Sequence, residues 1–162
     1  MSADTTFTIV REFPPADLAK AWRDCLTRVE LPSHYVAPEY LLEPQFAVER
    51  PFAVLAVDCR GAVTGVLTGL HEGHRLECGQ ISRPQICFDP GADLTATADA
   101  LARGILEEAR AETVLNVYSW TLIDAFRHSG FRMRHTEGVV VLDLTQGSEA
   151  IFRQFDENRR RN

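Results

Sequence analysis

The stretch from Leu76 to Ala111 constrains the fold most, because it has the pattern of a strand, a loop broken by proline and glycine, and a long helix. We expect the strand over Leu76–Ser82 and the loop over Arg83–Asp93. From Leu94 onward, apolar residues recur at spacings of three and four, which places one apolar stripe on a helix face. Such a helix would be about 27 Å long, the height of a small domain.

Asp93 directly precedes this helix, and we expect it to be the N-cap, because its carboxylate can accept from the first free backbone N–H groups. The same N–H groups face the loop. In α/β proteins a phosphate or another anion is often held at this position. The rest of the chain can be arranged around this unit.

Composition favours an ordinary single domain: the chain has 162 residues, of which 45% are hydrophobic and 25% charged. The net charge of -6 argues against nucleic-acid binding, which usually needs a basic face. No apolar run reaches the length of a membrane span. The first residues lack the basic and apolar regions of a signal peptide. We therefore expect a cytoplasmic protein with reduced thiols.

Two histidines and two cysteines fall close together in the sequence: His71, His74, Cys78 and Cys87. A zinc site is conceivable there, but the spacing fits no common zinc motif. The favoured interpretation is that the cysteines are buried or incidental, so no metal is expected.

The first third of the chain predicts one strand and two helices. Thr6–Arg11 alternates like a short strand, and Ala16–Val29 carries an amphipathic helix pattern. Tyr35–Phe46 contains two prolines around a short helical pattern. This segment could border a binding cleft, or it could be a connector packed on the sheet.

Two apolar runs, Phe52–Val57 and Ala62–Leu70, flank turn residues at Asp58–Gly61 and predict a β-hairpin. Gly65 and Gly69 fall on one face of the second strand, which leaves room for a helix or a ligand to approach. With the strand expected next, the hairpin forms an antiparallel meander.

Beyond the long helix the pattern predicts a strand, a helix that stops at Gly130, two more strands, and a last helix capped by Ser148. The first four of these elements are expected over Thr113–Tyr118, Leu122–Ser129, Phe131–Arg134 and Val139–Leu144. We therefore expect one domain over residues 1–147. Residues 148–162 would begin a C-terminal helix or a truncated linker.

This order of elements resembles the GNAT acyltransferase superfamily over nearly the whole chain. The hairpin strand with Gly65 and the segment Ala125–Phe131, a helix ending in Gly-Phe, carry the local likeness. The resemblance implies an α/β (α+β) fold, with a mixed central sheet of about six to seven strands flanked by helices. The fourth and fifth strands would splay apart. It also implies acyl transfer from acetyl-CoA or another acyl-CoA to the amine of a small molecule or peptide.

Three stretches resemble, more narrowly, the FemAB-type and CelD-type branch. They are Trp22-x-x-x-Leu26, Arg83–Phe88, and Val141–Leu144 followed by Phe152 and Arg159–Asn162. In that branch the last pattern continues into a helical linker and a second lobe. The alternative is therefore a non-catalytic first lobe that binds a substrate or a partner.

The resemblance implies that CoA lies at the end of the fourth strand and at the following loop. The residues that would contact it are Ile81, Ser82, Gln85, Gly91, Ala92 and Asp93. The usual Gln/Arg-x-x-Gly-x-Gly/Ala loop is incomplete, since Gln85 is followed only by Gly91-Ala92, and Pro90 removes one backbone donor.

Transfer to an amine needs a base and a proton donor. Glu77, in the fourth strand, is the candidate base, and its alternative is a solvated edge carboxylate. Tyr118 could donate a proton where the strands splay, or be an ordinary interface tyrosine. The tyrosine that many GNAT enzymes use as acid, four residues before Gly-Phe, is Phe126 here.

Other candidates are weaker. His71 and His74 could act as bases, but an exposed turn is the favoured interpretation for both. Cys87 could be a nucleophile only with a base beside it, and is otherwise a small buried residue. An exposed sheet edge could support a homodimer.

Overall fold

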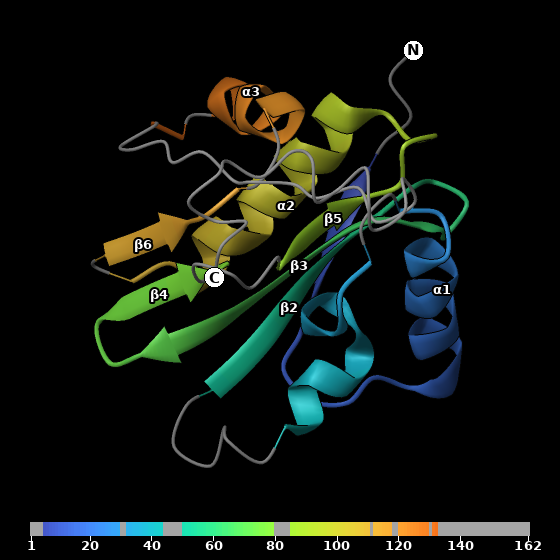
Figure 1. Ribbon diagram of the computed structural model, residues 1–162, viewed down its shortest axis with the longest axis horizontal. Coiled ribbons are helices and arrows are strands. Elements are labelled where there is room, and N and C mark those ends of the chain that lie inside the picture. Colours follow the sequence, from blue (N-terminus) through green and yellow to red (C-terminus); the bar gives the residue numbers. More distant parts are fainter. Residues whose placement is uncertain are drawn as a thin grey trace, which may run out of the picture.

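A computed structural model (Figure 1) describes residues 5–29, 32–43, 50–79, 85–110, 112–117, 120–129 and 131–132. Their elements, in chain order, are β1 (Thr6–Val10), α1 (Ala16–Leu26), the 3₁₀ turns η1 (His34–Val36) and η2 (Pro38–Leu42), β2 (Arg50–Val57), β3 (Val63–Glu72), β4 (Arg75–Cys78), β5 (Ile86–Phe88), α2 (Leu94–Glu108), β6 (Glu112–Leu115) and α3 (Trp120–His128). Six strands form one mixed sheet in the order β1-β2-β3-β4-β6, and β5 pairs with β3. Among the described elements, no helix is long and apolar enough to cross a membrane.

The sheet is the middle of three layers. Helices α2 and α3 lie on one face, while α1 and the two 3₁₀ turns lie on the other (Figure 1). Along β2, alternate side chains enter different cores: Phe52 and Val54 pack with α2, whereas Ala53 and Leu55 pack with α1. This explains why β2 is a continuous apolar run, since a strand covered on both faces has no polar side.

Helix α2 packs directly against the sheet at positions where glycines leave room for it. A Cβ atom at Gly65 of β3 would lie 2.5 Å from the Thr97 side chain of α2, and one at Gly104 of α2 would overlap Val54 of β2. The room predicted at Gly65 is therefore filled by a helix. At Gly69 the space is taken by Phe52 and Cys78.

Local signals predicted several elements correctly. The hairpin β2–β3 and its turn are confirmed, with Gly61 at φ +81°. Asp93 caps α2 by accepting from the N–H of Ala96 at 3.0 Å. Helix α1 begins where expected and ends at Leu26, with Trp22 buried on its inner face.

Other elements differ from the prediction in type or extent, among them β6, which ends at Leu115. The helix expected within Tyr35–Phe46 is two 3₁₀ turns, because Pro38 keeps the preceding Ala37 extended. The strand expected over Leu76–Ser82 is β4, which ends at Cys78. The loop expected over Arg83–Asp93 contains β5.

The C-terminal predictions are only partly covered. Phe131 and Arg132 are described and are not in a strand. The expected strand over Val139–Leu144, the helix after Ser148, and the segment 148–162 lie outside the described residues. The division into residues 1–147 and 148–162 therefore stays a prediction.

Candidate functional site

The expected fourth strand is divided into two. β4 pairs with β3 at Leu70↔Glu77, and β5 pairs with the same edge of β3 at Gly65↔Phe88. β6 pairs in parallel with β4 up to Cys78↔Leu115, and in the described part of the sheet it has no pairing with β5. The residues over which the fourth and fifth strands would diverge, 80–84 and 118–119, lie outside the described residues, so this divergence stays a prediction.

One buried glutamine bridges the gap between β4 and β5. The Gln85 carboxamide oxygen accepts from the N–H of Gly79 at 2.8 Å, and its NH₂ group donates to the Tyr40 hydroxyl at 2.8 Å. Its backbone oxygen accepts from the N–H of Thr68 at 2.8 Å. Gln85 is 1% exposed, so its side chain satisfies groups of the protein itself.

The residue that follows β6, Asn116, also bonds to the end of β4 and to Gly79. The Asn116 side chain donates to the Gly79 oxygen, and the Asn116 N–H donates to the Cys78 oxygen at 2.8 Å. Gly79 has φ +74°, and a Cβ atom there would lie 2.6 Å from the Asn116 oxygen. Both observations require glycine at this position.

Glu77 lies two residues before this point. Its neighbours Leu76 and Cys78 enter the core on the α2 side, so Glu77 points to the opposite face of the sheet. The Glu77 side chain is 16% exposed, and one carboxylate oxygen lies 3.3 Å from Arg75 Nη2. It is thus a half-buried carboxylate with one cationic partner, and its role as a base stays a prediction.

The loop between β5 and α2 is folded around Asp89. One Asp89 carboxylate oxygen accepts from the N–H of Gly91 at 2.9 Å, and its backbone oxygen accepts from the N–H of Ala92 at 3.0 Å. The other carboxylate oxygen accepts from Arg28 Nε at 2.6 Å. Burial alone would raise the pKa of Asp89, but the hydrogen bonds from Arg28 and Gly91 hold that pKa below its ordinary value.

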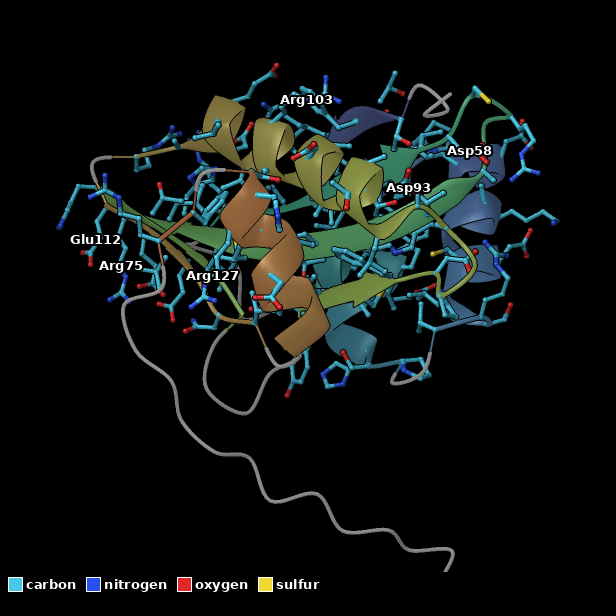
Figure 2. The ribbon with its side chains drawn as sticks, turned by 90° about the horizontal axis from the view of Figure 1, so that it is seen from above. Asp58, Arg75, Asp93, Arg103, Glu112 and Arg127 are labelled. Atoms are coloured by element: carbon cyan, nitrogen blue, oxygen red, sulfur yellow. The ribbon has the colours of Figure 1, made fainter. Side chains whose placement is uncertain are left out.

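Glu77 and this loop lie far apart along the sheet. Their register partners on β3, Leu70 and Gly65, are five residues apart, or about 17 Å. Figure 2 shows the same separation: Arg75 lies at one end of the sheet, and Asp93 lies toward the other.

A buried cluster that the sequence analysis missed joins the C-terminal end of α2 to the sheet. His71 was expected in an exposed turn, which is wrong, because β3 extends to Glu72 and the His71 side chain is 13% exposed. Its Nε2 lies 2.7 Å from one Glu108 oxygen, and Arg11 pairs with the other. Glu108 continues the apolar stripe of α2, seven residues after Leu101, so its position could have been read from the pattern.

Cys87 is buried in β5, whereas His74 lies in the turn between β3 and β4. Cys87 is buried, as expected, and burial raises the pKa of its thiol above the ordinary value. His74 is exposed, as expected. Within the described ranges, no group of His, Cys, Asp and Glu is arranged to hold a metal ion. Tyr118, Ile81 and Ser82 lie outside those ranges.

Phe126, at the position where many GNAT enzymes carry a tyrosine, is a packing residue. It is 2% exposed, and its ring meets those of Phe88 and Phe131 edge-on at centroid distances of 6.1 and 5.6 Å.

Comparison with known proteins identifies the fold. No protein-family model and no curated protein matches the sequence. Among solved structures, the chain is similar to glucosamine-6-phosphate N-acetyltransferase from Arabidopsis thaliana, with a TM-score of 0.50 and 12% identity over 85% of this chain and 99% of that one. It also matches an aminoglycoside N-acetyltransferase, AAC(6')-Iy, in complex with CoA, with a TM-score of 0.48 and 13% identity over 87% and 95% of the two chains. The first match, with the strand order above, shows a GNAT fold.

Proposed function

We propose that this chain is a GNAT-fold acyltransferase that moves an acyl group from a thioester to the amine of a small molecule or peptide. The observation that carries the proposal is the end of β4. There the described pairing of β6 with β4 ends, at Cys78↔Leu115, and the half-buried carboxylate of Glu77 lies one residue away. A base beside the expected divergence of these two strands is an arrangement suited to this reaction.

In the proposed reaction Glu77 takes a proton from the amine, directly or through a water molecule. The amine nitrogen then attacks the thioester carbon, so that a C–N bond forms and the C–S bond breaks. The departing thiolate takes a proton, for which Tyr118 is the proposed donor. Arg75, 3.3 Å from the Glu77 carboxylate, would hold the base in position.

Acetyl-CoA or another acyl-CoA is the donor that the fold implies, but the loop before α2 does not fit its diphosphate. Three N–H groups there, those of Gly91, Ala92 and Ala96, already donate to Asp89 or Asp93, and both carboxylates would face a diphosphate of the same charge. For this reason we assign no step to CoA itself.

The test is Glu77→Gln, which keeps the size of the side chain and removes the base. We expect the rate of acetyl transfer, followed as thiol release in the presence of a panel of amines, to fall about 100-fold or more. Glu72→Gln is the matched control, because Glu72 is exposed at the end of β3, opposite Arg75. Equal rates for Glu77→Gln and the unchanged protein would reject Glu77 as the base.

A second candidate is a non-catalytic module that binds a substrate or partner, like the first lobe of the FemAB-type branch. The loop before α2 favours this alternative, because N–H groups there already donate to the chain's own carboxylates. If an amine binds to the protein but no thioester transfers its acyl group to that amine, this alternative is supported. The likeness to that branch, the cytoplasmic location and a homodimer stay predictions.

A further inference from the structure

We infer that the loop between β5 and α2 is held in place by an ion pair and hydrogen bonds within the chain, and that it is not a diphosphate site. This inference rests on the proposed function. If the chain is an acyltransferase, it would recognise its donor by the acyl thioester and the pantetheine arm that carries it, and not by a nucleotide. The reason is that oxygens of Asp89 and Asp93 already accept hydrogen bonds from backbone N–H groups of the loop and of the first helical turn.

Most backbone donors of the loop are used within the chain. Three N–H groups, those of Gly91, Ala92 and Ala96, donate to Asp89 or Asp93 at distances of 2.9 to 3.0 Å. The N–H of Thr97 makes the first ordinary hydrogen bond of α2, to the Asp93 backbone oxygen at 2.9 Å. In the described loop, these bonds leave open the first-turn N–H groups of Leu94 and Thr95, and both stand next to the Asp93 carboxylate. The partial positive charge of the helix start is thus already matched by an acid of the chain.

Arg28, the cation near this loop, also has its hydrogen-bond partners within the chain. Arg28, just beyond α1, donates to the Asp89 carboxylate, to the Val63 oxygen at 3.3 Å and to the Asp24 oxygen at 2.7 Å. It therefore ties the end of α1 to the loop and to β3. A diphosphate would have to displace Asp89 from Arg28 and would still meet two carboxylates.

This loop also lies far from the proposed chemistry, about 17 Å along β3 from the register position of Glu77. Figure 2 places Asp93 at the start of α2, toward the end of the sheet that carries Asp58. The loop and the proposed chemistry can therefore be tested separately.

The test compares acetyl-CoA with S-acetylpantetheine, which has the same thioester and arm but no diphosphate. We expect kcat/KM values within threefold of each other. A preference of 100-fold or more for acetyl-CoA would overturn the inference while leaving the proposed function intact.

A variant gives the matched control. Thr95→Glu adds a carboxylate at an exposed first-turn position, where an acid is favourable for the helix. We expect it to change neither donor's kcat/KM by more than twofold. A tenfold loss confined to acetyl-CoA would show that the loop binds the diphosphate.

If neither donor is turned over, the proposed function fails, and the inference is decided by thermal unfolding with excess CoA. A ligand that binds the folded state raises the unfolding temperature by mass action. An unchanged temperature supports the inference. A rise that Thr95→Glu abolishes overturns it.

Discussion

The two ends of α2 both carry acidic side chains paired with arginine, but the surroundings differ. At the start, Asp93 is exposed, and the Asp89 side chain in the preceding loop is 16% exposed and meets Arg28, whose side chain is 42% exposed. At the end, Glu108 is only 5% exposed and lies between His71 and Arg11. Water can replace a lost partner at the first end and not at the second. The same kind of pair should therefore be weak at the start of the helix and costly to break at its end.

The largest effect is expected for Glu108→Ala. It removes the partner of a largely buried histidine and leaves a gap below β3, so the free energy of unfolding should fall by about 3 kcal/mol. Chemical denaturation measures this change. Glu107→Ala, an exposed neighbour on the same helix, is the control and should change stability by less than about 0.5 kcal/mol. Equal effects of the two variants would contradict the buried cluster.

An intermediate loss of unfolding free energy is expected for Asp93→Ala, because this change removes the acceptor of the hydrogen bond from the Ala96 N–H at the helix start. The loss should be about 1 kcal/mol. Asp93→Asn keeps an acceptor at the same place and should be nearly silent. If Asn were as damaging as Ala, the charge of Asp93 would matter more than its cap.

The smallest effect is expected for Arg28→Met, at less than about 1 kcal/mol near neutral pH, since the pair is partly solvated. Folding lowers the pKa of Asp89, despite the opposing effect of burial, so its contribution is present above the unfolded pKa and is lost as pH falls through the folded value. The stability difference between Arg28→Met and the unchanged protein should therefore shrink below about pH 4. A difference that grows in acid would contradict this sign.

How far the sequence could predict these features depends on how local their causes are. The Asp93 cap and the hairpin turn at Gly61 were predictable, because their signals lie within a few residues. β5 was not, because Ile86–Phe88 is too short to show a period, and it is a strand only by pairing with β3. The buried state of His71 depends on Glu108, 37 residues away in the chain.

The candidate site shows the same limit. The resemblance directed attention to Gln85 and Glu77, and the structure places both beside the break in the fourth strand. The bonding of Gln85 could not be foreseen, because it depends on the Tyr40 hydroxyl, 45 residues earlier. Glu77 was named because the resemblance implies a base near the fourth strand, and Glu77 is the carboxylate at the start of that expected strand.

The bridge made by Gln85 also affects how the chain can change over evolutionary time. Because its side chain fastens Gly79 on one side of the gap and its backbone joins β3 on the other, the two strand ends are held independently of the residues between them. The entropy of closing a loop grows only slowly with its length. Insertions or exchanges between Gly79 and Gln85 should therefore leave the sheet in register, so that related chains can diversify there while keeping the same core.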